Sequence, residues 1–488
     1  MKKQNIIRPL EIINMITVIC VGCLLSLLLM QMFFTGYFGM DDWEHWATSW
    51  FMYHGYLPYR DFFQHHNPLL WYLELPFFSF VDHPLDIFQI GRVIAAVFFL
   101  GGCFFIGKIV QALGGTATSF LYALLVYLSY PASAGTYIQN RPDTYMVFCM
   151  LFGLYFWIRF YQGKKERDLL FCYFLFFLSF AFLQKAIWFL APFGIYQLYL
   201  LIKGKIKWAP VIRASILPLL IIVGYGIYLY QTGSLIRYWE LNWILNLYYF
   251  RDYQSYSYGV LDYVYNFLCP CFLLVGIFKG KGLLRQLSFV LFGFALIYFF
   301  VPKLYQFYWL IWTPFAAIIL GLGTERVLKS SLFLGRFFVM AFLILSCFLS
   351  GVYIFTEGRF VVNEPFEQVV RNLEKHRKIG DDLVDYGDFR GVFFRTHPAH
   401  YYWYNLMRGA LWDSYLFHRH ELPDWDGYIY KNKPRYIIHH EVYDLMRADD
   451  QNKDYKIMGV SEDWLIQNYR YLDDCDVYER LEKDDTKK

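Results

Sequence analysis

Residues 15–46 read MITVICVGCLLSLLLMQMFFTGYFGMDDWEHW, so a long apolar run leads directly into a group of ionisable side chains. A bilayer core of roughly 30 Å is crossed by about 20 apolar residues in a helix. Ionisable groups at a membrane boundary are costly to desolvate and commonly have a function. The stretch therefore predicts a membrane helix with a catalytic site at its mouth, and Asp41 and Asp42 are the first candidates.

The composition extends this prediction to the whole chain. Of the 488 residues, 57% are hydrophobic and 22% are aromatic, which exceeds the content of an ordinary soluble domain. The first run has no small-residue cleavage site, so we expect it to be a retained helix rather than a signal peptide. We predict a polytopic α-helical membrane protein with about eleven transmembrane helices, near residues 12–34, 88–108, 118–133, 144–162, 169–183, 187–202, 211–230, 260–278, 287–301, 308–323 and 332–354.

The basic residues give the expected orientation, because Lys and Arg near helix ends favour the cytoplasmic side. They cluster before the first span and on alternate connections after it, at Lys108, 164–167, 203–207, 279–285 and 326–329. The N-terminus is therefore predicted to be cytoplasmic. With an odd number of spans, the chain after the last one lies outside the cell membrane.

The C-terminal part differs in composition. Residues 356–488 contain 26 acidic and 20 basic residues, so their net charge is −6, whereas residues 1–355 carry +10. We predict a transmembrane domain over 1–355, with a catalytic first outer loop at 35–87, and a small extracytoplasmic α/β domain over 356–488. Its expected helices are 364–377 and 401–411, and its expected strands are 382–386 and 435–438.

Several kinds of site receive no support from the sequence. The nine cysteines lie almost all within predicted spans, where a thiol behaves as a small hydrophobe, and their spacing suggests neither a disulfide framework nor a zinc site. We find no phosphate-binding glycine loop and no motif for nucleic acid.

Four polar segments fall on the predicted outer side. They are GYLPYRDFFQHHNP at 55–68, Arg141-Pro142-Asp143, Gln184-Lys185, and PKLYQFY at 302–308. Together with the Asp41-Asp42 pair, they resemble the multi-pass C-type glycosyltransferases, in particular the bacterial relatives of protein mannosyltransferases and of the aminoarabinose transferase of lipid A. In that family the first outer loop usually carries Asp-Glu, so Asp42 stands here where a longer side chain is more common.

The resemblance implies a sugar transferase of the cell envelope. Its donor and co-substrate would be a sugar linked through phosphate to a polyprenyl lipid, and its acceptor a cell-surface glycan, lipid or protein. The implied catalytic residues are Asp41, Asp42 and Asp143, and Asp41 is the expected general base. The implied cations for the donor phosphate are Lys185, Lys303, Arg141 and Arg60, and the implied substrate contacts are Glu44, His45, Tyr59, His66, Tyr305, Gln306 and Tyr308.

Elementary chemistry gives a separate reason for these residue types. A carboxylate that removes the proton of the acceptor hydroxyl accelerates transfer typically by 10²–10⁴-fold. The departing lipid phosphate gains charge, so fixed cations stabilise the transition state more than the ground state. Direct displacement with one base predicts inversion at the anomeric carbon.

Each choice has a simpler alternative. Asp41 and Asp42 could instead cap a helix that starts there, or do both. Asp143 could merely pair with Arg141, and lysines at helix ends commonly snorkel. Glu44 and His45, with His65 and His66 nearby, would suit a divalent cation or a solvated face. Trp43, Trp46 and Trp50 are typical of interfacial anchors, and the aromatic segment 231–258 is typical of a lid over the donor or of an aromatic belt.

Two other classes of function stay open at this point. A transporter or flippase of lipid-linked saccharides also needs many spans, but acidic residues are scarce within the predicted spans, where coupling sites usually lie. A non-enzymatic envelope scaffold would keep its role when Asp41 is neutralised.

Overall fold

The computed structural model describes most of the membrane part and short segments of the tail. The described residues are 4–34, 40–81, 86–129, 139–247, most of 271–278, 282–300, 310–330 and 333–357, and in the tail 372, 375–376, 383–385, 430–438, 462–474 and 477–482.

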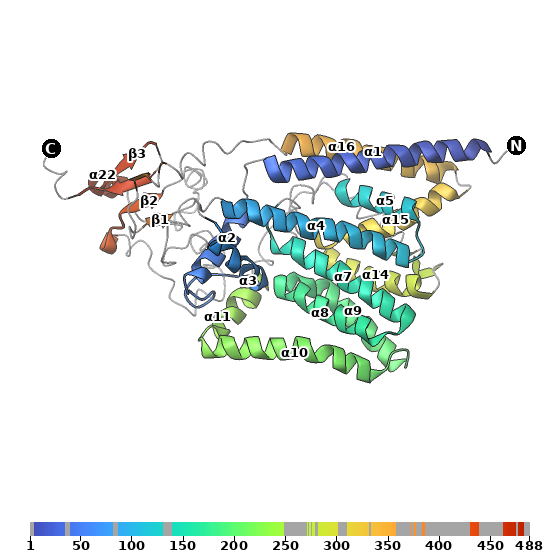
Figure 1. The fold of residues 1–488 in the computed structure, drawn as a ribbon, viewed down its shortest axis with the longest axis horizontal. Coiled ribbons are helices and arrows are strands. Elements are labelled where there is room, and N and C mark those ends of the chain that lie inside the picture. Colours follow the sequence, from blue (N-terminus) through green and yellow to red (C-terminus); the bar gives the residue numbers. More distant parts are fainter. Residues whose placement is uncertain are drawn as a thin grey trace.

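Long helices lie side by side with nearly parallel axes and form the body of the molecule (Figure 1). Their bounds are α1 Gln4–Phe34, α4 Asp86–Ala112, α5 Ala117–Ser129, α7 Pro142–Gly163, α8 Glu166–Phe182, α9 Ile187–Ile202, α10 Trp208–Gln231, α14 Gly282–Phe300, α15 Thr313–Lys329 and α16 Phe333–Glu357.

Some of the predicted spans lie on described helices that could cross a membrane. Five segments within the described residues are long and apolar enough to cross a membrane: Glu11–Met30, Asp86–Ala112, Pro142–Gly163, Gln184–Ile202 and Trp208–Gln231. Most of the predicted span at 260–278 lies outside the described residues. The total of about eleven spans therefore stays a prediction.

Close helix contacts depend on small residues. Helix α15 packs against α5, and a Cβ atom on Gly321 would lie 2.6 Å from the carbonyl oxygen of Ser119 and 2.7 Å from the backbone nitrogen of Ala123. Because both contacts are backbone atoms, a larger residue at 321 would push the two helices apart. Small residues have this role widely in membrane helix pairs, where packing replaces the hydrophobic driving force.

Helix α7 positions part of the candidate site. It begins at Pro142, which suits the first helical position because proline has no N–H to satisfy. It ends at Gly163, and the next residue, Lys164, terminates the helix with a left-handed φ of 54°. Helix α7 packs against α4 and α8, with Tyr145 and Trp157 completely enclosed. The start of α7, which carries Arg141 and Asp143, is thereby fixed in the core.

Shorter elements gather at the end of the helical body nearest the C-terminal sheet (Figure 1). They are α2 Met40–Tyr53, α3 Leu69–Glu74, the 3₁₀ turns Leu75–Ser79 and Gln184–Ala186, α11 Leu235–Trp239 and a π-helical turn at Glu240–Ile244. Trp46 of α2 is completely buried, and a Cβ atom on Gly91 would lie 2.8 Å from its ring. The prediction that Trp46 anchors the chain at a membrane interface is therefore wrong, because its ring fills the space left by Gly91 on α4.

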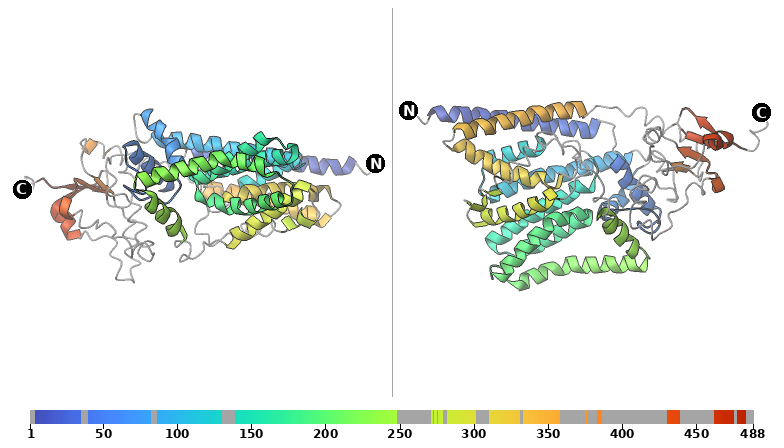
Figure 2. Two further views of the ribbon diagram at one scale, coloured as in Figure 1. Left: turned by 90° about the horizontal axis from the view of Figure 1, so that it is seen from below. Right: turned by 180° about the vertical axis from the view of Figure 1, so that it is seen from behind.

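The tail contains a four-stranded sheet in the order β1-β2-β4-β3. Strand β1 (Leu383–Asp385) is parallel to β2 (Tyr436–Ile438), whereas β4 (Val477–Arg480) is antiparallel to β2 and to β3 (Tyr469–Leu472), which follows helix α22 (Glu462–Asn468). Figure 2 shows this sheet beyond the α2 end of the helical body from two further sides. Strands β1 and β2 lie at the predicted strand positions, whereas the predicted helix 401–411 and most of 364–377 lie outside the described residues.

Candidate functional site

Two buried carboxylates meet at one asparagine. The backbone N–H of Asn140 donates to Oδ1 of Asp42 at 2.5 Å, and its side-chain Nδ2 donates to Oε1 of Glu74 at 2.6 Å. Ser49 donates to Oε2 of Glu74, and the hydroxyl of Tyr145 donates to Oδ1 of Asn140. Asp42, Glu74 and Asn140 are each only 1% exposed. Asn140 therefore holds α2, α3 and α7 in one fixed arrangement around the two acids.

Glu74 is a residue that the sequence interpretation missed. It is the single acid in the apolar stretch LLWYLELPFFSF at 69–80, and that isolation was the available signal. Burial raises the pKa of its carboxyl to about 8, although hydrogen bonds from Ser49 and Asn140 act in the opposite direction. Glu74 is thus held largely protonated near neutral pH, beside the carboxylate of Asp42.

This pKa predicts a measurable dependence of stability on pH. Folding raises the pKa of Glu74, so the protonated carboxyl stabilises the folded state. This contribution to stability is complete below about pH 4.5 and is lost as the pH rises through about 8. Between those values wild type should lose at most about 1.4 kcal/mol per pH unit relative to Glu74→Gln, which cannot ionise. Thermal unfolding of both proteins from pH 5 to 8 measures the difference. Parallel stability curves would show that Glu74 ionises as freely in the folded protein as in the unfolded chain.

Asp143 lies between two cations. Its Oδ2 is 3.5 Å from Nε of Arg141, and its Oδ1 is 3.7 Å from Nζ of Lys185. The three side chains are 1%, 5% and 9% exposed, respectively. The pairing alternative for Asp143 and Arg141 is therefore seen in the structure, whereas Lys185 points into the protein and does not snorkel. The triad carries one net positive charge in its ionised form.

A second cluster combines one carboxylate and two imidazoles. Candidate ligand atoms of Glu44, His65 and His66 all lie within 4.8 Å of one another. Nδ1 of His65 is 3.9 Å from Oε1 of Glu44, which also accepts from Nε2 of Gln64 at 3.0 Å. Nδ1 of His66 is buried without a hydrogen-bond partner among the described residues. An orphaned buried imidazole nitrogen is what a metal ion would satisfy.

The protonation states suit ligands. Burial lowers the pKa of His65 to about 3 and holds that of His66 well below its usual range, so both rings are neutral and keep a lone pair. Burial also raises the pKa of Glu44 to about 8, a shift that a bound cation would reverse. His45 lies outside this group, since its Nδ1 accepts from the indole N–H of Trp71 at 3.2 Å.

The clusters are electrostatically connected. After burial and the hydrogen bond from Gln64, the charge of Lys185 is the next influence on the pKa of Glu44, and it lowers it. Burial lowers the pKa of His45, and the negative charge of Asp143 acts in the opposite direction. Residues from three segments far apart in the sequence thus form one site.

The segment after α10 covers part of this site. Tyr238 and Asn242 both donate to Oδ1 of Asn67, at 2.9 and 2.7 Å, and Asn246 donates to the carbonyl oxygen of His65 at 3.0 Å. Nδ2 of Asn67 donates to the carbonyl oxygen of Phe180 at 2.6 Å. The described part of the aromatic segment 231–258 therefore lies on the histidine loop. Residues 248–258 lie outside the described residues.

Most predicted site residues that the structure describes come together. Tyr59 joins the group through its hydroxyl, which donates to the carbonyl oxygen of His66 at 2.5 Å. Arg60 instead pairs with Asp61 at 2.7 Å, and its side chain is 46% exposed. The backbone of Asp41 lies in the first turn of α2, whereas the structure does not describe its side chain. Residues outside the described part altogether are Lys303, Tyr305, Gln306 and Tyr308.

Solved structures of other proteins resemble this architecture. The crystal structure of ArnT from Cupriavidus metallidurans in the apo state superposes with a TM-score of 0.57 at 13% identity, over 89% of this chain and 94% of that chain. The chain has the fold of ArnT. The same enzyme bound to undecaprenyl phosphate matches with a TM-score of 0.59 at 12% identity, over the same shares of the two chains.

The family comparison agrees with the structural one. Residues 84–228 match the family described as dolichyl-phosphate-mannose-protein mannosyltransferase, whereas no curated protein sequence matches significantly. The predicted resemblance to multi-pass C-type glycosyltransferases is thereby confirmed. With the apolar helices, the ArnT fold also confirms a multi-pass α-helical membrane protein.

Proposed function

We propose that the protein transfers a sugar from a polyprenyl-phosphate carrier to a cell-surface glycan, lipid or protein at the outer face of the cell membrane. The observation that carries the proposal is the convergence of buried acids and cations at one end of an ArnT-like helical body. The second ArnT structure is bound to undecaprenyl phosphate, which supports a polyprenyl phosphate as the donor carrier here.

The residues divide the chemistry between them. Asp42 accepts from Asn140, so we assign the general base to Asp41, which removes the proton of the acceptor hydroxyl as that oxygen attacks the anomeric carbon. The bond to the lipid phosphate breaks in the same step, and the net positive charge of the Arg141, Asp143 and Lys185 triad stabilises the departing phosphate. Attack opposite the leaving group inverts the anomeric carbon. Lys303 is assigned to the same phosphate on its sequence context.

Mass spectrometry of surface glycans tests the proposal. A strain lacking this gene should lose a sugar from a cell-surface glycan, lipid or protein, and wild-type protein should restore it. The identity of the missing sugar names the donor. Accumulation of a complete, untransferred saccharide on its lipid carrier at the inner face would instead indicate a flippase. Unchanged composition with altered recovery of an envelope assembly would indicate a scaffold.

We also propose that Glu44, His65 and His66 hold a divalent cation. One carboxylate and two imidazoles form a donor set that suits Zn²⁺ and related ions, with a remaining position for a water or substrate oxygen. When bound, the cation would favour the ionised form of Glu44.

Metal analysis checks this site directly. The purified wild-type protein should contain close to one equivalent of a divalent metal by inductively coupled plasma mass spectrometry, and His66→Gln should lose most of it. His54→Gln is the control, since His54 is an exposed imidazole directly after helix α2, the helix that carries Glu44. Chelator should lower the unfolding temperature of wild type but not of His66→Gln. Equal metal content in all three proteins contradicts the assignment.

The orientation completes the proposal. The turns that join α7 to α8 and α9 to α10 lie at the end of the helical body that carries the N-terminus (Figure 1). Both turns carry clustered lysines, which favours a cytoplasmic location for that end. The candidate site and the tail then face outward.

A further inference from the structure

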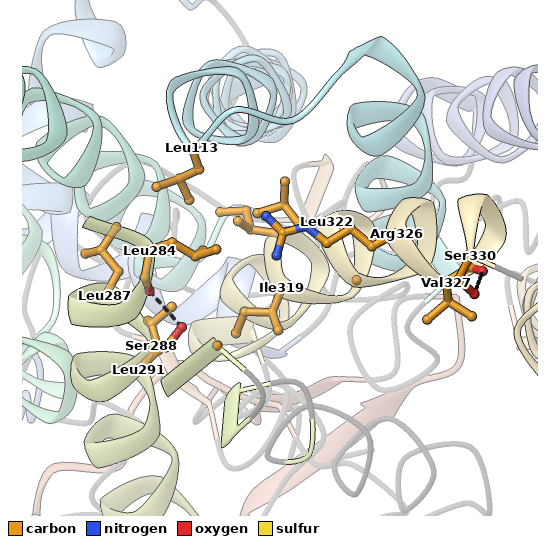
Figure 3. A pocket seen from close by; sticks show the side chains of 13 residues that line it. Leu113, Leu284, Leu287, Ser288, Leu291, Ile319, Leu322, Arg326, Val327 and Ser330 are labelled. Atoms are coloured by element: carbon orange, nitrogen blue, oxygen red, sulfur yellow. Dashed lines mark hydrogen bonds between the residues drawn. The ribbon is translucent and has the colours of Figure 1, made fainter. Parts of the chain in front are cut away.

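A cavity lies at the end of the helical body opposite the candidate site. It has a volume of about 210 Å³ and opens between α14, α15 and the residue that follows α4. Leucine and isoleucine side chains form most of its wall, as Figure 3 shows. Its position near the C-terminus of α15 places it at the end that the basic turns predict to be cytoplasmic.

The lining offers a ligand one charged group. The hydroxyls of Ser288 and Ser330 donate to carbonyl oxygens of their own helices, those of Leu284 and Val327. Arg326 is the charged side chain of the lining, and it is exposed. In Figure 3 its guanidinium turns back along α15 toward Leu322 and the cavity. The cavity thus combines an apolar body with one cation at its edge.

The acidic residue next to Arg326 in the sequence, Glu325, makes its contacts on another face of α15. Glu325 is 6% exposed and accepts hydrogen bonds from Thr116, at 2.6 Å, and from Ser119 of α5. It also pairs with Lys329 on its own helix. No ion pair of Arg326 occurs within the described residues. The local acid therefore neutralises Lys329 and leaves the positive charge beside the cavity.

We propose that this cavity binds one acyl chain of an anionic phospholipid from the cytoplasmic leaflet, with the lipid phosphate on Arg326. An acyl chain satisfies the apolar wall, and a phosphate matches a guanidinium through paired N–H donors. A juxtamembrane cation adds about 1 kcal/mol of attraction to anionic lipid, equivalent to about fivefold in affinity. The competing explanation is that Arg326 only stabilises the negative end of the α15 dipole.

Lipid co-purification separates these explanations. The full-length protein is reconstituted in mixed micelles with equimolar phosphatidylglycerol and phosphatidylcholine of identical chains, re-purified, and the retained lipids are quantified by mass spectrometry. Wild type should retain about fivefold more phosphatidylglycerol than phosphatidylcholine. Arg326→Gln should abolish the preference. The control Arg285→Gln removes an exposed arginine from the first turn of nearby α14 that does not line the cavity, and it should keep the preference.

A second variant tests the chain-binding part. Leu284→Trp fills the cavity from the α14 side while it keeps Arg326, and it should lower retention of phosphatidylglycerol although the cation is present. No preference in wild type, equal loss in Arg285→Gln, or full retention in Leu284→Trp would each overturn the proposal. So would retention of added undecaprenyl phosphate in place of phosphatidylglycerol, since the cavity would then serve the donor. None of these readouts depends on sugar transfer.

Discussion

Asp41→Asn should lower the rate of sugar transfer by roughly 10²–10⁴-fold, the usual contribution of a general base. The amide keeps the size of the side chain but cannot accept the proton of the acceptor hydroxyl at neutral pH. Release of the lipid phosphate from a purified polyprenyl-phosphate sugar donor measures the rate. In cells, the missing surface sugar should be restored by wild type and not by Asp41→Asn at matched protein levels.

Two companion variants make this result specific. Asp42→Asn retains a carbonyl oxygen for the N–H of Asn140, so the transfer rate should fall much less than in Asp41→Asn. Asp168→Asn removes another buried aspartate, one paired with Arg159 at 3.5 Å, and should leave transfer unchanged. A larger loss in Asp42→Asn than in Asp41→Asn would move the base to Asp42. Full restoration of the sugar by both Asp41→Asn and Asp42→Asn would favour the transporter or scaffold alternatives.

Lys185→Met should reduce both transfer and stability. Removal of one electrostatic contact to a developing anion commonly costs 10²–10³-fold in rate. The variant also removes one of the two cations that contact the buried carboxylate of Asp143, which should cost about 1 kcal/mol of folding free energy because Arg141 still pairs with it. Transfer kinetics and thermal unfolding measure the two effects separately.

A double variant separates the two roles of Lys185. Lys185→Met with Asp143→Asn also leaves the guanidinium of Arg141 buried without a carboxylate, so stability should fall further while transfer stays low. Lys329→Met is the matched control, because Lys329 also pairs with a buried carboxylate, that of Glu325, far from the site. It should lose stability without loss of rate. Recovery of transfer in the double variant would show that Lys185 acts only by neutralising Asp143.

The fold class could be predicted because bilayer thickness imposes a length and apolar character on every span. The ArnT-like fold agrees with that prediction. The structure also places Asp42, Asp143 and Lys185, which are far apart in the sequence, at one end of the helical body. Asn140 could not be found, because its importance arises from a backbone N–H and a side chain that meet two acids distant in sequence. Arg60 shows the reverse case, since its sequence context resembles a site although its side chain pairs with the neighbouring Asp61.

The hydrogen bonds at Asn67 bear on how a lipid donor reaches the site. If entry requires the segment after α10 to lift away, the bonds from Tyr238 and Asn242 both break. Two such bonds contribute about 1–3 kcal/mol net, which lowers the population of the open state by roughly 5- to 150-fold. Association of the donor would be slowed by that factor. Asn67→Ala removes both of these bonds and leaves the bond from Asn246 to the carbonyl oxygen of His65, so it should accelerate donor binding without changing the rate of the chemical step.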